Sequence, residues 1–290
     1  MHQESYGPKF RQIRRQKGLS IVEAAAGIVS KSGLARWETG KGSLSFEQVL
    51  SLLVENNIQP IEFIQKNIFP DLDTIVQTVN QAHDSNEVAI LKEHAVKAVA
   101  NYQLDPQDKA NLFKAAIACN YYQDLTAENL FPKIAQLKLK LYFSKIVAEN
   151  NYWGFESIFF FVNTALLFEP ADVSSYAEDL ILFIKDENLS ANDWYPYIIN
   201  GLLNLVFALI KKDPKPAHKL LSTISKLKNI DYYSLAKIRI KFMHCLLNYI
   251  DDKNETQVQK IFADLDFFGM QPLNKQFQRA FSQIKSIYED

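Results

Sequence analysis

Apolar residues recur at helical spacing along nearly the whole of this 290-residue chain, and no segment shows a convincing alternation of apolar and polar residues. A repeat of about 3.6 residues indicates α-helices, whereas a half-buried strand needs a repeat of two. Glycine and proline are scarce, at 9 and 10 residues, which argues against an all-β fold with many tight turns. The sequence therefore predicts an all-α protein.

The predicted helices fall into two groups of different length. Up to residue 68 they are short, and Ser20 and Ser30 are good N-caps for two of them. From residue 72 onward the helices lengthen and pair through short connections, with N-caps predicted at Ser190 and Asp231 and a further helix start near residue 271. An interval of about 40 residues is typical of stacked helix hairpins, none of which buries its apolar face alone.

Charge is divided unevenly along the chain. The whole sequence has a net charge of −1, but residues 1–41 contain eight basic and three acidic side chains. A small basic piece attached to an acidic remainder favours contact with nucleic acid through the N-terminal part.

Residues 20–40 contain two short predicted helices separated by a tight turn, which is the pattern of a helix-turn-helix unit. The second helix of such a unit lies in the major groove with the side chains of its first turn at the base edges. We therefore predict base contacts at the start of this helix and phosphate contacts from the basic side chains around it. The predicted DNA-binding residues are Arg11, Arg14, Arg15, Ser30, Lys31, Ser32, Arg36 and Lys41, with Lys17 as a further phosphate candidate. The alternative for each basic residue is a solvated surface position, and Trp37 is predicted to lie in the core.

Two stretches of the sequence carry motifs of a known family. Residues 19–40 and 45–53 include the pattern Ser-Lys-Ser-x-x-x-Arg-aromatic-Glu-x-Gly, and residues 151–156 have the sequence Asn-Tyr-Trp-Gly-Phe-Glu. The first stretch resembles the Rgg/GadR/MutR family of transcriptional regulators from Gram-positive bacteria. The second is similar to that family's Trp-Gly-Tyr/Phe-Glu segment.

The resemblance implies a homodimer whose five-helix helix-turn-helix domain is followed by a right-handed superhelix of tetratricopeptide-like helix hairpins. Applied to this sequence, it implies a DNA-binding domain at 1–68, a linker helix at 69–85 and a regulatory and dimerisation domain at 86–290. Many such regulators bind short imported peptide pheromones on the concave face of the repeat domain. The partners that the resemblance implies are therefore double-stranded promoter DNA and a short hydrophobic signalling peptide, as in quorum sensing.

The resemblance also gives DNA-contact roles to Lys31, Ser32 and Arg36. Gly33 and Ala35 are smaller than is usual in a recognition helix. This departure favours recognition of the DNA backbone and shape over rich direct base readout.

Asparagines inside otherwise apolar helices are the candidates for holding a peptide. Asn163, Asn204 and Asn248 are 41 and 44 residues apart, close to the helical repeat, so they could form a ladder along one face. An asparagine amide has both donors and an acceptor and binds a peptide unit in both senses. The predicted peptide-binding residues are Trp153, Asn163, Asn200, Asn204, Arg239 and Asn248. The alternatives are that these asparagines cap turns or face solvent, and that Arg239 pairs with a neighbouring glutamate rather than with a peptide carboxylate.

Other classes of protein have little support. Cys119 and Cys245 are too few and too far apart for a disulfide framework, the first residues contain no apolar signal core, and residues 157–168 and 197–210 fall short of the roughly 18 apolar residues of a membrane span. We therefore expect a cytoplasmic protein with no membrane segment. The five histidines form no metal-ligand spacing and no glycine-rich phosphate loop is present, so no metal, cofactor or enzymatic activity is expected. Two other functions stay open: a DNA-binding regulator without a peptide ligand, and an intracellular repeat adaptor that binds a partner protein.

Overall fold

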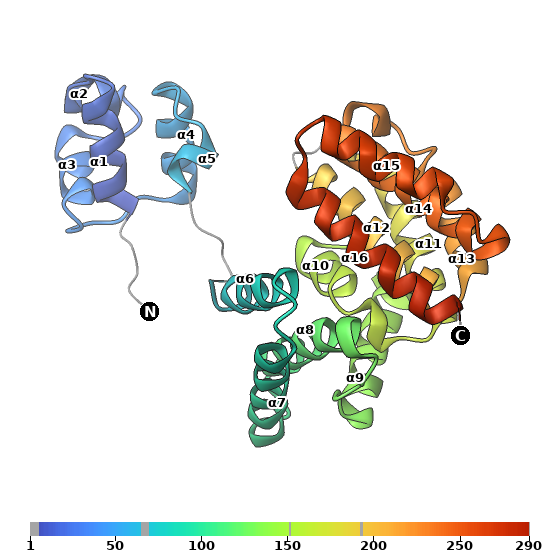
Figure 1. Ribbon diagram of the computed structural model, residues 1–290. Coiled ribbons are helices and arrows are strands. Elements are labelled where there is room, and N and C mark those ends of the chain that lie inside the picture. Colours follow the sequence, from blue (N-terminus) through green and yellow to red (C-terminus); the bar gives the residue numbers. More distant parts are fainter. Residues whose placement is uncertain (1–5, 65–69, 151, 192–193, 290) are drawn as a thin grey trace. The chain divides into compact units, whose positions relative to one another are not determined.

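The regular secondary structure is helical in the part of the chain that the computed structural model describes, which is residues 6–64, 70–150, 152–191 and 194–289 (Figure 1). The predicted all-α class is therefore confirmed. The chain divides into two compact units, Met1–Pro70 and Asp71–Asp290. Within the described ranges, no helix has both the length and the apolar character that crossing a bilayer requires.

Unit 1 is built from five short helices whose starts are set by side-chain caps. They are α1 (Tyr6–Gln16), α2 (Ile21–Ala25), α3 (Lys31–Glu38), α4 (Phe46–Glu55) and α5 (Pro60–Phe63). The hydroxyl of Ser20 accepts a hydrogen bond from the backbone N–H of Glu23, whose carboxylate accepts one from the N–H of Ser20 in return. Ser30 caps α3 in the predicted way, with its hydroxyl accepting from the N–H of Gly33. The two N-caps that the sequence predicts in this unit are confirmed.

Aromatic packing holds unit 1 together. The rings of Phe10 and Trp37 lie 5.4 Å apart between centroids, and Phe63 lies 6.4 Å from Trp37. Trp37 is 8% exposed, so its predicted place in the core is confirmed. Gly7 allows α1 to approach the end of α3 closely, because a Cβ at that position would lie 1.8 Å from the carbonyl oxygen of Trp37. The recognition-helix candidate α3 is thus fixed against α1.

Unit 2 consists of longer helices that form hairpins through short connections. They are α6 (Pro70–Asp84), α7 (Val88–Leu104), α8 (Lys109–Thr126), α9 (Lys133–Lys145), α10 (Phe155–Val162), α11 (Pro170–Asp186), α12 (Tyr195–Lys212), α13 (Pro214–Ile224), α14 (Ser234–Asp252), α15 (Thr256–Phe267) and α16 (Gln271–Tyr288). A π-helical turn η1 (Ile146–Asn150) and three 3-10 turns, η2 (Ala165–Leu167), η3 (Leu189–Ala191) and η4 (Ile230–Tyr232), lie between them. Contacts are densest within the pairs α7/α8 and α12/α13, as expected for antiparallel helices joined by short loops, and α12 also packs against α14.

The repeat is present, but its helices begin later than the predicted caps. Ser190 and Asp231 lie in the 3-10 turns η3 and η4, which precede α12 and α14. Pro196 lies in the first turn of α12, where a residue without an N–H loses no helical hydrogen bond. Asp231 forms an ion pair with Lys237 at 2.6 Å instead of capping the helix. These two cap assignments are therefore wrong, although α12, α14 and α16 still start at comparable intervals.

Helix α16 runs back along the earlier helices of unit 2 (Figure 1). Arg279 on α16 donates a hydrogen bond to the backbone oxygen of Asp84 at the end of α6. Gln283 donates to the backbone oxygen of Asp124 on α8 at 3.0 Å, and the hydroxyl of Tyr288 donates to the carbonyl of Ile210 on α12 at 2.6 Å. The last helix therefore packs across α6, α8 and α12.

Helix α6 corresponds to the expected linker helix. Its residues Val79 and Ala82 are buried in the hydrophobic core of unit 2. The described part of α6 therefore packs as a member of the second unit.

Candidate DNA-binding surface and ligand pocket

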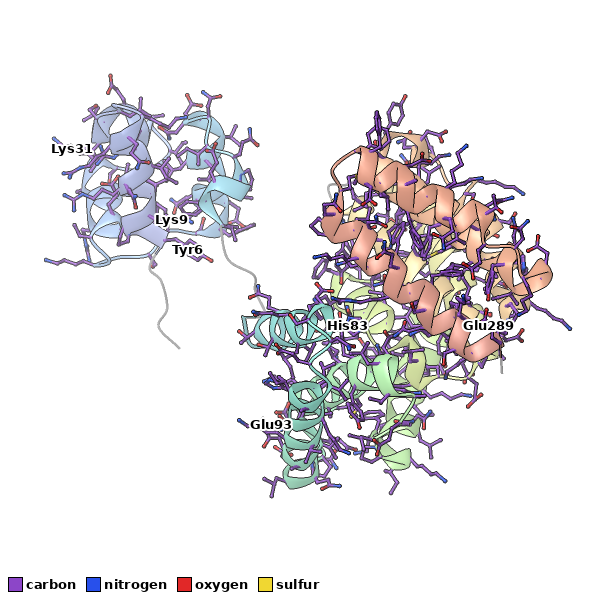
Figure 2. All side chains as sticks on the ribbon, viewed as in Figure 1. Tyr6, Lys9, Lys31, His83, Glu93 and Glu289 are labelled. Atoms are coloured by element: carbon purple, nitrogen blue, oxygen red, sulfur yellow. The ribbon has the colours of Figure 1, made fainter. Side chains whose placement is uncertain are left out.

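The first turn of α3 is open to solvent on unit 1. The hydroxyl of Ser30 lies 3.2 Å from that of Ser32 and caps the helix through Gly33 at 3.0 Å. Lys31, Ser32 and Arg36 are exposed, and Figure 2 shows Lys31 at the edge of the unit with its side chain directed outward. The helix therefore has one face anchored in the core and a polar, cationic face that begins at its N-terminus, as insertion into a DNA groove requires.

The basic side chains near α3 differ in accessibility. Arg15, Lys17 and Lys41 are exposed, and Arg11 is half-buried. Nη2 of Arg36 donates to the backbone oxygen of Lys41 at 3.5 Å, which is the outer limit of a hydrogen bond. These side chains are placed where phosphate contacts are sterically possible, and their roles stay predictions.

Arg14 is different, and its burial corrects the expectation that it contacts phosphate. Its Nε donates to Oε1 of Glu38 at 2.6 Å and its Nη2 to Oε2 at 2.8 Å, while Nη1 donates to the carbonyl of Leu19 at 2.7 Å. Arg14 is 7% exposed and Glu38 is 2% exposed. The hydrogen bonds to Glu38 raise the pKa of Arg14 above its ordinary value. The guanidinium therefore links α1 to α3 and has a structural role.

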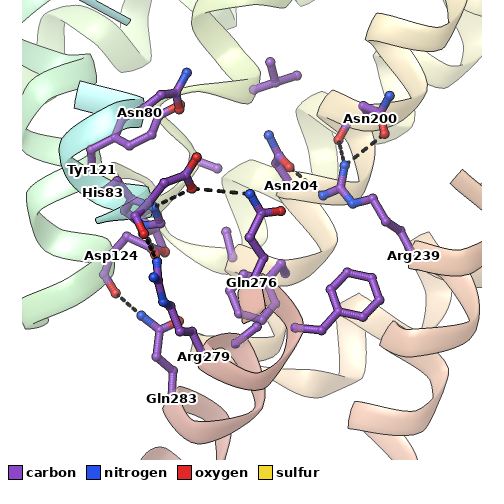
Figure 3. Close-up of a pocket in the computed structure, with 18 of the residues that line it drawn as sticks. Asn80, His83, Tyr121, Asp124, Asn200, Asn204, Arg239, Gln276, Arg279 and Gln283 are labelled. Atoms are coloured by element: carbon purple, nitrogen blue, oxygen red, sulfur yellow. Dashed lines mark hydrogen bonds and ion pairs between the residues drawn. The ribbon is translucent and has the colours of Figure 1, made fainter. Parts of the chain in front are cut away.

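Unit 2 contains a pocket of about 480 Å³ that is lined by residues of α6, α8, α10, η2, α12, α14 and α16 (Figure 3). Its lining combines apolar side chains with an unusual number of side-chain amides. The amides are Asn80, Asn120, Asn163, Asn200, Asn204, Gln276 and Gln283. The apolar lining includes Val162, Leu166, Phe207, Leu235, Phe242, Met243, Leu273 and Phe277. A lining of this composition suits a ligand with apolar side chains and an amide backbone.

Asn163 both shapes the pocket and lines it. Its Nδ2 donates to the carbonyl of Phe159 at 2.7 Å at the end of α10, and its Oδ1 accepts from the hydroxyl of Tyr121 at 3.2 Å. Asn120 accepts from the backbone N–H of Leu166 at 2.9 Å and thereby fixes η2 against α8. These two amides therefore hold the pocket wall in place. The hydrogen bond from Asn163 to Phe159 also agrees with the alternative prediction that this asparagine caps a turn.

Asn200, Asn204 and Arg239 form one hydrogen-bonded group on the pocket wall (Figure 3). Arg239 on α14 donates through Nη1 to the backbone oxygen of Asn200 at 3.1 Å and to its Oδ1 at 3.0 Å. Its Nη2 donates to Oδ1 of Asn204 at 2.7 Å. Burial lowers the pKa of Arg239 to about 10. The structure thus brings together three predicted peptide-binding residues, and the predicted pairing of Arg239 with a glutamate does not occur among the described residues.

Sequence reasoning missed a charged cluster on another part of the pocket wall. Asp124 on α8 accepts from Nε2 of His83 at 2.8 Å and from Nζ of Lys211 at 2.8 Å, with its backbone oxygen accepting from Lys211 at 3.0 Å and from Gln283 at 3.0 Å. Burial alone would raise the pKa of the Asp124 carboxyl, but the charge of Lys211 and the hydrogen bond from His83 lower it well below its ordinary value. The partners are 41 and 87 residues away in the sequence, so no local motif indicates them.

Two predicted peptide-binding residues lie outside the pocket, which corrects those predictions. Trp153 is fully buried, donates through Nε1 to Asp179 at 2.7 Å and packs against Phe143 and Phe161. Asn248 is exposed and its nearest hydrogen-bond partner is Gln257 on α15, at 3.4 Å. The predicted three-rung asparagine ladder is therefore wrong at its third member, because residue 248 lies beyond Met243, the last residue of α14 that lines the pocket.

Solved structures share this fold along nearly the full length of the chain. A putative transcriptional regulator from Listeria monocytogenes is 16% identical, with a TM-score of 0.72 and coverage of 98% of both chains. The SHP pheromone receptor Rgg2 from Streptococcus dysgalactiae is 16% identical, with a TM-score of 0.69 and coverage of 96% of this chain and 99% of that one. PlcR from Bacillus thuringiensis, solved with the peptide PapR7 and DNA, is 15% identical, with a TM-score of 0.54 and coverage of 96% and 99%.

Two family profiles match the two units. A helix-turn-helix profile matches residues 10–63, which contain the capped helices α2 and α3. The profile of the C-terminal domain of the HTH-type transcriptional regulator Rgg matches residues 96–279, which include most of the pocket lining. The second match covers well over half of the chain and contains the motif at residues 151–156, and the first match contains the motif at residues 30–40. The chain therefore belongs to the Rgg family of helix-turn-helix transcriptional regulators.

Proposed function

We propose that this regulator is controlled by a short apolar peptide that binds in the pocket of unit 2. The observation that carries the proposal is the lining, in which seven side-chain amides face a space otherwise walled by leucine, phenylalanine and other apolar side chains. The cavity of about 480 Å³ lies within the range of ligand sites, roughly 300–1,000 Å³. Support also comes from the fold, which is shared with a pheromone receptor and with a regulator solved in complex with a peptide.

Control by a ligand requires that the peptide prefer one arrangement of the protein over another. The pocket walls provide a physical basis for this, because a few side-chain hydrogen bonds hold α16 to its neighbours: Gln276 and Arg279 donate to Asp84 of α6, and Gln283 donates to Asp124 of α8. A ligand that contacts α12, α14 and α16 together would change the free energy of the contacts that join α16 to α6 and α8. We propose that this is how occupancy of the pocket alters the behaviour of the dimer.

We further propose that the protein acts as a homodimer in the cytoplasm, where promoter DNA lies. Helix α4 of unit 1 carries Phe46, Leu50 and Val54 at four-residue intervals on one face, and these side chains are 66%, 40% and 76% exposed. An apolar stripe of this kind on so small a unit is typical of an interaction surface. A second copy related by a two-fold axis would cover it and would match the symmetry of a palindromic operator.

Calorimetry on the full-length protein tests the peptide proposal. The probes are synthetic peptides encoded by small open reading frames beside the gene. We expect one of them to bind with a heat that Asn204→Ala reduces and Asn248→Ala leaves unchanged, because Asn204 lines the pocket and Asn248 does not. Equal effects of the two variants would place the site elsewhere. No heat with any of these peptides would favour a regulator without a peptide ligand.

A further inference from the structure

The pocket lining includes three basic side chains, those of His83, Arg239 and Arg279, whose surroundings differ. His83 is hydrogen-bonded to the carboxylate of Asp124, and that carboxylate also forms an ion pair with Lys211. Arg279 is exposed to solvent and donates to a backbone oxygen. Arg239 is half-buried and has no carboxylate partner among the described residues.

All three hydrogen bonds of Arg239 go to neutral oxygens, two on Asn200 and one on Asn204. An amide oxygen satisfies the geometry of an N–H donor but does not neutralise the charge of a half-buried guanidinium. The drop in the pKa of this guanidinium is caused by burial alone, with no charged neighbour to offset it. The pocket wall therefore carries a half-buried cation that an anion would stabilise.

The hydrogen bonds also leave suitable donors available. Asn200 and Asn204 lie one helical turn apart on α12 and engage Nη1 and one hydrogen of Nη2. The Nε hydrogen and the second Nη2 hydrogen have no acceptor within the described part of the chain. In a guanidinium the Nε–H and the Nη hydrogen beside it are parallel, and their spacing matches the two oxygens of a carboxylate.

We propose that Arg239 is the site that recognises a carboxylate on the ligand. This inference rests on the proposed function, since it assumes that a short apolar peptide occupies the pocket. The carboxylate is supplied either by the C-terminus of the peptide or by an acidic side chain, and both have the same bidentate chemistry. Leu235, Phe242 and Met243, which line the pocket from the same helix, would surround the ion pair with apolar groups and strengthen it.

Affinity selection followed by mass spectrometry tests this on the full-length protein. The probes are three mixtures of N-acetylated heptapeptides of leucine, isoleucine, valine and phenylalanine: one with free C-terminal acids, one with C-terminal amides, and one of amides in which a single residue is glutamate. We expect the wild type to retain one of the two acidic mixtures on the order of tenfold or more above the neutral amides, as a charge-assisted bidentate bond implies. The mixture that is enriched identifies the source of the carboxylate.

Variants of Arg239 test whether this residue causes the preference for acidic peptides. In Arg239→Gln the ratio of acidic to neutral peptides retained should fall to about one, and Arg239→Lys should keep only part of it because an ammonium lacks the planar fork. Lys241→Gln is the matched control, since it removes the same charge from an exposed position on α14. Circular dichroism shows whether each variant is folded, and the comparison of acids with amides in the wild type needs no variant at all.

Three results would overturn the inference. Equal retention of all three mixtures by the wild type would show that peptides bind without a carboxylate contact. A preference that persists in Arg239→Gln, or that is lost in Arg279→Gln instead, would assign it to another group. Retention of none of the mixtures would overturn the proposed function along with this inference.

Discussion

The guanidinium of Arg14 and the carboxylate of Glu38 form a two-point ion pair, with Nε–Oε1 at 2.6 Å and Nη2–Oε2 at 2.8 Å, inside the N-terminal unit. The pair joins the first helix to the end of the helix that carries the predicted base contacts. Its burial means that each partner depends on the other, because an unpaired charge in this position would be withdrawn from water without compensation.

Replacing one partner of this pair should therefore destabilise the unit. We expect Arg14→Ala to lower the free energy of unfolding by about 3–5 kcal/mol, as measured by urea denaturation. Arg15→Ala removes the same side chain from the exposed neighbouring position and should change stability by less than about 0.5 kcal/mol. An Arg14→Ala protein that kept its stability but lost DNA affinity would show that Arg14 contacts phosphate after all.

Lys31→Ala and Arg36→Ala should each weaken binding to duplex DNA. Both side chains are exposed on α3, and each phosphate contact that is lost should reduce the slope of log affinity against log salt by about one. Fluorescence anisotropy with a labelled promoter fragment at several salt concentrations measures this slope. Lys260→Ala, an equal loss of charge on exposed α15, is the control. A wild-type affinity that does not vary with salt would contradict the electrostatic premise.

Asp124 should make the stability of unit 2 depend on pH in the acidic range. Its pKa is lowered in the folded state, mainly by Lys211 and His83 acting against burial, so its contribution is present above the unfolded pKa of about 4 and is lost as the pH falls below that value. Asp124→Asn should cost about 3 kcal/mol at pH 7, because it leaves the ammonium of Lys211 buried without a counter-ion.

The same variant should lose less stability than the wild type between pH 5 and pH 2, since it has no carboxylate to protonate at this position. Urea denaturation at pH 7, 5 and 3 measures both effects. Identical pH dependence of wild type and variant would mean that the cluster contributes nothing to acid sensitivity.

Trp153→Phe should affect stability without affecting ligand binding. The change removes the 2.7 Å hydrogen bond from the indole to Asp179 and should cost about 1–3 kcal/mol, while the ring still packs against Phe143. Thermal unfolding gives the loss of stability, and calorimetry with the bound peptide gives the affinity. A large loss of affinity in a protein of normal stability would restore Trp153 to the ligand site.

Val54→Gln should weaken the association of two DNA-binding units. Val54 is 76% exposed on α4, and a polar side chain there should lower the affinity for a palindromic duplex while leaving the affinity for a single half-site unchanged. Leu104→Gln, at an 85% exposed position in unit 2, is the control. Equal loss on both duplexes would show that α4 does not mediate pairing.

Much of this protein is determined by patterns within a few residues of one another. Helical periodicity gives the all-α class, and Ser20 and Ser30 cap their helices because the hydroxyl and the N–H it accepts from lie within one turn. The motif around Arg36 indicates the family because its residues are also close together in the sequence. Features of this kind can be predicted without the tertiary structure.

Contacts between distant segments were decided only by the tertiary structure. Arg14 and Arg15 are neighbours of the same type, yet one is buried against Glu38 and the other is exposed, because only one lies on the face that α1 turns toward α3. Asp124 likewise acquires its partners when α6, α8 and α12 pack together. Whether a polar side chain binds a ligand or satisfies a neighbour depends on what the fold places within about 3 Å of it, and spacing along the chain does not encode that distance.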